Sequence, residues 1–141
     1  MSLDVVYTIS STATGGGRDG HVKSATGRID LDTRPPKEMG GSGEGTNPEE
    51  LFSAGYSACF LGAVHAVARG EKVAVPDGTT VTVTVGFGKT ASGFGINAAI
   101  EAHLPGLEQD AAETLVAKAH ELCPYSNATR GNIDVDVTTT V

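Results

Sequence analysis

The feature that most constrains the fold is a stretch of the chain, residues 51–68, that carries no charged side chain. Asn47 is suited to cap a helix just before it, and Pro48 fits the first helical position. An acidic residue three positions after Asn47 completes a capping pattern, and Gly70 ends the apolar run. The sequence therefore predicts a helix from Pro48 to about Arg69, apolar on nearly every side like a central buried helix.

Alternating apolar residues predict strands on both sides of this helix. The expected strands cover residues 3–9, 81–85, 94–104 and 133–137, with a weaker candidate at 22–31 that follows the turn-rich segment GGGRDG. A second amphipathic helix is expected from about Leu107, and Pro124 prevents its easy continuation beyond Cys123. The pattern predicts an α+β fold of two layers, with about five to six strands and two main helices, in a single domain over residues 1–141.

Composition excludes some classes of partner. The chain has 141 residues, 39% of them apolar, a net charge of -7 and a pI near 4.9, so we expect no binding to nucleic acid or to anionic membranes. No basic segment followed by an apolar run begins the chain, and polar or glycine residues interrupt the predicted helix at several positions. We therefore expect a cytoplasmic protein with neither a signal peptide nor a membrane span, in which cysteines stay reduced or redox-active.

Small residues recur at every fourth position of the predicted central helix. Ala54, Ala58 and Gly62 would let another backbone approach that face closely. The partner is either a second copy of the chain across a two-fold axis or the protein's own sheet, and the sequence leaves both open.

The two cysteines, Cys59 and Cys123, lie 64 residues apart and follow no metal-binding or CxxC spacing. His65 is out of helical register with Cys59, and the glycine-rich segments lack the residues of a phosphate-binding loop. We expect no bound metal and no nucleotide cofactor. By residue type alone, both cysteines are better explained as small buried hydrophobic side chains than as reactive thiols.

Three segments carry a resemblance to a known family: TATGGGRDGHV, TNPEELFSAGYSACF and LCPYSNATRGNIDV. In this order they resemble the organic hydroperoxide resistance (Ohr) family, a branch of the Ohr/OsmC superfamily. The resemblance implies an OsmC-like intertwined homodimer and a peroxidase that reduces organic hydroperoxides to alcohols. It also implies no bound cofactor, with a dihydrolipoamide-type dithiol, free or on a lipoylated protein, as the reducing co-substrate.

The resemblance assigns roles to four residues. Cys59 matches the peroxidatic cysteine, Cys123 the resolving cysteine, and Arg18 and Glu49 the pair that accompanies the reactive thiol. Cleavage of a peroxide needs a thiolate, whereas an ordinary thiol with a pKa of about 8.5 is mostly protonated at neutral pH. Arg18 is the expected cation, and Glu49 would hold it by a bidentate ion pair.

Helix geometry adds a prediction to these roles. Ten residues at about 1.5 Å each place Glu49 and Cys59 about 15 Å apart along one straight helix. Either the helix begins later than Pro48, or the Glu49 beside a given Cys59 belongs to another subunit. Three further expectations concern the surroundings. His120 is a surface residue, and Cys59 and Cys123 form a disulfide after oxidation. The residues around Cys59, including Phe52, Tyr56, Phe60 and Leu61, could supply an apolar pocket, although core packing is the role expected for most of them.

Two alternatives remain beside the Ohr interpretation. One is a broader peroxidase of the osmotically inducible OsmC type. The other is a non-catalytic redox sensor or a carrier of apolar ligands.

Overall fold

The computed structural model describes residues 2–141, and the chain divides into two compact units that meet between Leu51 and Phe52. The first unit contains a three-stranded antiparallel sheet in the order β1-β2-β3, followed by a short 3-10 helix. These elements are β1 (Ser11–Gly15), β2 (Gly20–Ser24), β3 (Asp30–Thr33) and η1 (Lys37–Met39). The segment GGGRDG forms the turn between β1 and β2, as predicted. The expectation of a single domain over residues 1–141 stays a prediction.

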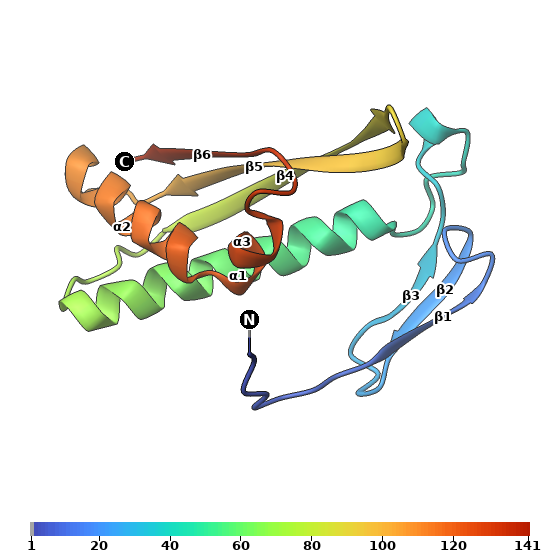
Figure 1. Cartoon of the computed structure of the whole chain (residues 1–141), viewed down its shortest axis with the longest axis horizontal. Helices are drawn as coiled ribbons and strands as arrows, with labels where there is room; N and C mark the ends of the chain where they lie inside the picture. Colours follow the sequence, from blue (N-terminus) through green and yellow to red (C-terminus); the bar gives the residue numbers. More distant parts are fainter. Residues whose placement is uncertain (1) are drawn as a thin grey trace. The chain divides into compact units, whose positions relative to one another are not determined.

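The strand predicted at residues 3–9 is wrong for this chain. Residues 2–10 contain no strand, and the alternating side chains of Leu3, Val5, Tyr7 and Ile9 are all exposed. Figure 1 shows this segment as an extended trace that leads into β1. The residues have the alternation of a strand, but no strand in the described part of the chain covers their apolar side.

The weak strand predicted at 22–31 is divided into β2 and β3 by a tight turn. Gly27 has a φ of +75°, a conformation that glycine adopts at little cost, and its N–H donates to the carbonyl of Ser24. The chain reverses there, so two short strands replace one long one.

The long central helix, α1 (Pro48–Glu71), begins where the sequence predicts. The Asn47 Oδ1 accepts a hydrogen bond of 2.8 Å from the N–H of Glu50, which satisfies one of the free donors of the first turn. The helix ends two residues later than expected, because Gly70 continues it.

Within one chain α1 is not buried on all sides, a case that the sequence left open. By length and composition it is apolar enough to span a membrane, as core helices of soluble proteins also are, yet only 28% of its most apolar window is buried. The uncovered face includes the small residues Ala54, Ala58 and Gly62. A face of small residues on this helix is therefore exposed within one chain.

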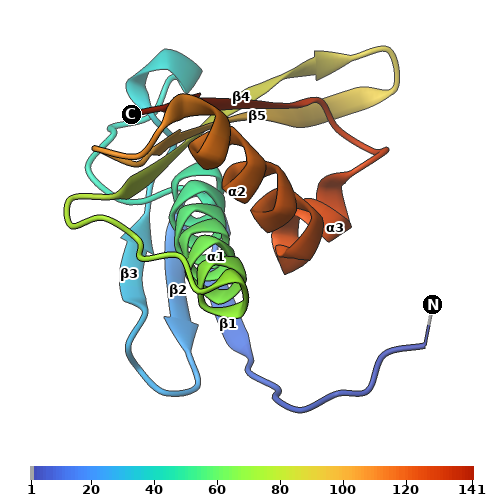
Figure 2. The same ribbon diagram turned by 90° about the vertical axis from the view of Figure 1, so that its left-hand side faces the viewer.

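The second unit, from Phe52 onward, has two layers. Its sheet has the order β4-β5-β6, with β4 and β5 antiparallel and β5 and β6 parallel. Figures 1 and 2 show the helices on one face of this sheet. The elements are β4 (Thr80–Thr90), β5 (Gly93–His103), α2 (Gln109–Leu122), α3 (Pro124–Thr129) and β6 (Val135–Thr140).

The core of the second unit lies between these two layers. Ile100 of β5 is fully buried between its neighbours in register, Val83 of β4 and Val137 of β6. From the helices, buried side chains pack against this sheet; they include Tyr56, Phe60 and Val64 of α1 and Leu115, Val116 and Ala119 of α2. Over residues 2–141 the chain has six strands, two main α-helices and one short α-helix, so the α+β prediction is confirmed.

Candidate active site

Two cysteines from different helices meet in the second unit. Cys59 lies on α1 and is half-buried, whereas Cys123 is fully buried at the junction of α2 and α3. Pro124 starts α3 directly after Cys123, whose extended backbone (φ −61°, ψ 122°) separates the two helices. Both thiols are free, and the Cys123 thiol donates to the Cys59 Sγ at an S–S distance of 3.6 Å. A disulfide needs a contraction of about 1.5 Å from here.

The Cys59 thiol is not activated by its own unit. Burial raises the pKa of Cys59 above its ordinary value, and the neighbouring thiol of Cys123 raises it further. A backbone hydrogen bond from Tyr125 acts in the opposite direction but does not outweigh burial. With these surroundings alone, Cys59 is a protonated thiol at neutral pH.

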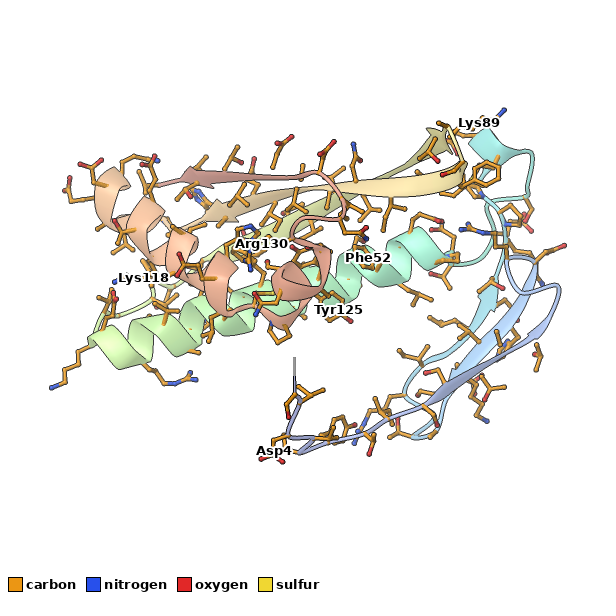
Figure 3. All side chains as sticks on the ribbon, viewed as in Figure 1. Asp4, Phe52, Lys89, Lys118, Tyr125 and Arg130 are labelled. Carbon is orange, nitrogen blue, oxygen red and sulfur yellow. The ribbon has the colours of Figure 1, made fainter. Side chains whose placement is uncertain are left out.

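Aromatic rings flank the cysteine pair. Phe52, Tyr56 and Tyr125 form a triangle with ring centroids 5.6 to 6.0 Å apart, and Figure 3 labels Phe52 on α1 and Tyr125 on α3. The Tyr125 hydroxyl lies over Gly55, where a Cβ atom would come within 2.8 Å of its oxygen. The glycine therefore makes room for the tyrosine.

Of the four residues considered for an apolar pocket, two pack in the core, the role expected for most of them. Tyr56 and Phe60 are fully buried in the core, while Phe52 and Leu61 are half-buried. Sequence reasoning missed Tyr125, although it stands two residues after Cys123 within the motif that carried the resemblance.

The other predicted site residues, Arg18 and Glu49, meet in the first unit. The Arg18 guanidinium donates two hydrogen bonds to the Glu49 carboxylate, with N–O distances of 2.7 and 3.1 Å. These bonds lower the pKa of Glu49 and raise the pKa of Arg18, so both groups are charged. Glu49 is largely covered, whereas 44% of the Arg18 side chain is exposed. The bidentate pair thus leaves part of the cation accessible.

The loop that carries Arg18 is held from β3. The Thr33 hydroxyl donates to the carbonyl of Gly17 at 2.5 Å and accepts from the N–H of Gly20 at 3.0 Å. A Cβ atom on Gly20 would lie only 2.1 Å from the carbonyl oxygen of Thr14, so no larger residue fits there. Sequence reasoning missed Thr33 because these contacts span 13 and 16 residues and follow no motif spacing.

His120 is not the surface residue that was expected. It is half-buried on α2, and its Nδ1 lies 2.8 Å from the hydroxyl oxygen of Ser126. Burial lowers the pKa of His120 below its ordinary value, and Arg130 lowers it further. The imidazole is therefore neutral at neutral pH.

Among residues 2–141, no group of three or more histidine, cysteine or carboxylate side chains is arranged to hold a metal ion. The chemistry-bearing groups are instead two pairs: Cys59 with Cys123, and Arg18 with Glu49. The first can exchange electrons as thiols and a disulfide, and the second can present a fixed cation.

Comparisons with known proteins identify the family. The family model of the OsmC-like protein matches residues 41–138. An organic hydroperoxide resistance protein of Xanthomonas axonopodis is 49% identical, with 95% of this chain and 94% of the relative covered. OhrB, an organic hydroperoxide resistance protein of Bacillus subtilis, is 40% identical, with 92% of this chain and 95% of the relative covered. The crystal structure of an organic hydroperoxide resistance protein from Legionella pneumophila matches with a TM-score of 0.93 and 47% identity, over 98% of this chain and 100% of that chain.

These matches span almost the whole length of both partners, and the α+β fold agrees with them. The chain therefore belongs to the OsmC-like family. Within this family its named relatives are organic hydroperoxide resistance proteins, which confirms the resemblance seen in the sequence.

Proposed function

We propose that the protein is a dithiol-dependent peroxidase that reduces organic hydroperoxides to alcohols. The observation that carries this proposal is the pair of free thiols, Cys59 and Cys123, 3.6 Å apart beside an aromatic cluster. An oxidised sulfur and a resolving thiol at this distance can form a disulfide after a small movement.

The reaction begins with the Cys59 thiolate attacking the outer peroxide oxygen. An S–O bond forms as the O–O bond breaks, and the departing alkoxide takes a proton to become the alcohol. Cys59 is left as a sulfenic acid, which condenses with the thiol of Cys123 to give the disulfide and water. A dithiol such as dihydrolipoamide, free or on a lipoylated protein, then takes up the oxidation as its own disulfide and restores both thiols.

Arg18 supplies the charge that Cys59 lacks. Its guanidinium stays protonated and offers several donors, so it can contact both the thiolate and a peroxide oxygen. Glu49 fixes the orientation of Arg18 through the two hydrogen bonds seen in the first unit. Lowering the pKa of Cys59 by about two pH units requires about 2.7 kcal/mol of preferential stabilisation of the thiolate.

The catalytic unit is a homodimer. Because α1 does begin at Pro48, ten residues of helix separate Glu49 from Cys59, or about 15 Å along the axis. A partner subunit is the source of the Arg18–Glu49 pair for each Cys59. Two exposed features support the proposed association with a second copy of the chain. They are the small-residue face of α1 and the alternating apolar side chains of residues 3–9. The proposed compartment is the cytoplasm, where reducing conditions keep both thiols free.

The test compares reduction of cumene hydroperoxide and hydrogen peroxide with excess dihydrolipoamide, by the wild-type protein and by Cys59→Ser. We expect fast turnover that prefers the organic peroxide and disappears in Cys59→Ser, while a matched Ser57→Ala variant keeps it. Equal use of hydrogen peroxide would favour the broader OsmC-type activity. Absence of turnover with any dithiol would contradict the proposal and favour a sensor or carrier.

Mixed dimers test where the residues come from. A heterodimer of a Cys59→Ser chain and a Glu49→Ala chain has one site with Cys59 and Glu49 both intact, if the two residues come from different subunits. We expect mixing two inactive homodimers to restore activity in such a site. No recovery would place Cys59 and Glu49 in the same chain's site.

A further inference from the structure

A buried hydrogen-bond network joins the segments that carry the two cysteines. Its centre is the hydroxyl of Ser126 on α3, which is fully buried. Tyr56 of α1 approaches this oxygen with its hydroxyl at 2.9 Å, and His120 of α2 approaches it with Nδ1 at 2.8 Å. The hydroxyl of Thr129 lies 3.3 Å from that of Tyr56 and donates to the carbonyl of Ser126.

Three residues of the network each lie three positions from a cysteine. Tyr56 precedes Cys59 by three residues on α1, and His120 precedes Cys123 by three residues on α2. Ser126 follows Cys123 by three residues, on the other side of the break at Pro124. The network therefore connects one helical turn beside each sulfur, and it holds all three helices together at the point where the thiols meet.

The hydrogen bonds of the network are complete with either neutral tautomer of His120. With the imidazole hydrogen on Nε2, Nδ1 accepts from Ser126 and Ser126 accepts from Tyr56; with the hydrogen on Nδ1, His120 donates to Ser126, Ser126 to Tyr56 and Tyr56 to Thr129. Thr129 uses its hydrogen on the carbonyl of Ser126, and every hydroxyl hydrogen has an acceptor. Arg130 adds a further bond of 2.6 Å from its guanidinium to the carbonyl of His120.

We propose that Ser126, held between Tyr56 and His120, is a positioning residue that sets the separation of Cys59 and Cys123 and hence the reduction potential of their disulfide. The inference rests on the disulfide of the proposed function. Thiols held close together form a disulfide more readily than thiols that can move apart, because less conformational freedom is lost on bonding. Loss of the central hydroxyl leaves the buried Tyr56 and His120 without their shared partner, and the cysteine segments are held less firmly.

The test measures the disulfide directly and not through peroxide turnover. Full-length wild-type, Ser126→Ala and Tyr56→Phe proteins are oxidised with diamide and equilibrated with dihydrolipoamide and lipoamide at fixed ratios. The free thiols are then alkylated and counted by mass spectrometry. Ser57→Ala is the matched control, because its hydroxyl donates to the carbonyl of Ala54 in its own helix and bonds to none of the described residues of the network.

We expect the equilibrium constant for disulfide formation to fall about tenfold in Ser126→Ala, which corresponds to about 30 mV. Tyr56→Phe should shift it in the same direction, and Ser57→Ala should not. With an excess of cumene hydroperoxide and no reductant, both network variants should also accumulate more Cys59 sulfinic acid, since slower condensation leaves the sulfenic acid exposed to a second peroxide molecule.

Several outcomes separate this inference from the proposed function. If Ser126→Ala and Tyr56→Phe have the wild-type potential, the positioning role is wrong even where peroxide turnover is normal. If only Ser126→Ala changes, and its circular dichroism shows loss of structure, the intact Tyr56→Phe variant decides against the role. If the wild-type disulfide forms with diamide but no peroxide is consumed, the proposed function fails while the network can still be assessed from the potentials.

Discussion

The Arg18 guanidinium and the Glu49 carboxylate are joined by two parallel hydrogen bonds, and Glu49 is the more covered of the two. A flexible side chain held at two points keeps one orientation, whereas a single contact would let it rotate. The pair therefore delivers a cation of fixed direction, and loss of direction should cost activity even when both charges remain nearby.

Replacement of Glu49 by Gln should lower kcat/KM for cumene hydroperoxide about tenfold. An amide can accept only one of the two bonds, so Arg18 remains but loses its fixed orientation. Steady-state kinetics with saturating dihydrolipoamide measure the effect. Glu50→Gln is the matched control, since Glu50 instead accepts a bond from the Thr46 hydroxyl, and it should stay within about twofold of wild type. Equal losses in the two variants would contradict a specific role of Glu49.

Removal of Arg18 should return the pKa of Cys59 to the raised value that its own unit imposes. In the wild-type protein the rate of alkylation by iodoacetamide should titrate about two pH units lower than in Arg18→Ala. The pH dependence of that rate is the measurement, made on Cys123→Ser backgrounds so that one thiol reacts. Coincident titration curves would show that Arg18 does not stabilise the thiolate.

Substitution of Gly20 by Ala should displace the loop that holds Arg18. The added methyl group would meet the carbonyl oxygen of Thr14, and that oxygen belongs to the backbone and cannot move aside cheaply. We expect a loss of kcat/KM close to that of Arg18→Ala, with the diamide-formed disulfide unaffected. Gly17→Ala is a useful comparison, because its Cβ meets nothing within 4 Å although its φ of +74° adds strain. Retained activity in Gly20→Ala would mean that the loop adapts.

The free energy of unfolding should fall as the pH falls through the range of His120. The folded-state pKa of His120 lies below its unfolded value near 6.5, so the unfolded chain takes up a proton first. The loss begins below about pH 6.5 and is complete below the folded-state pKa. His120 lines a cavity of about 700 Å³. The charged residues that line it as well are Glu113 and Glu121 of α2 and Arg130, whereas β6 contributes only uncharged residues.

Urea denaturation of wild-type and His120→Asn proteins between about pH 7 and pH 5 measures this contribution. The variant should lose less stability than wild type over that range. His21 must be kept intact in both proteins. Asp32 and Asp30 raise the pKa of His21, so the stability that His21 contributes changes with pH in the opposite direction to that of His120. The stabilisation by His21 is present below about pH 6.5 and is lost as the pH rises through its folded-state pKa. Parallel pH profiles would rule out a contribution from His120.

Local signals in the sequence predicted the start of α1 and most of the second unit. The cap at Asn47, the alternation of β4 and β5 and the stop at Pro124 each depend on residues within a few positions of one another. The strand at residues 3–9 failed for a different reason: alternation shows that one side of a segment is apolar, but not which chain covers it. The turn at Gly27 was missed because a single glycine within an alternating run is a weak signal.

The four candidate site residues followed from the resemblance, since spacing alone gave no reason to pair Cys59 with Cys123. The contacts that surround these four residues could not be predicted from the sequence. Tyr56 bonds to a residue 70 positions away, and Thr33 bonds across 13 and 16 positions. Such contacts depend on how the helices and strands pack, and no short motif in one sequence records them.

The difference in burial between the two sulfurs fixes where oxidation enters the molecule. Cys123 is fully covered, whereas Cys59 is partly accessible. An oxidant arriving from solvent can reach the Cys59 sulfur but not the covered Cys123 sulfur, so the proposed two-electron oxidation would begin at a defined atom. In the proposed reaction the buried Cys123 thiol would then meet only its oxidised neighbour, so accessibility alone would set the order in which the two cysteines react.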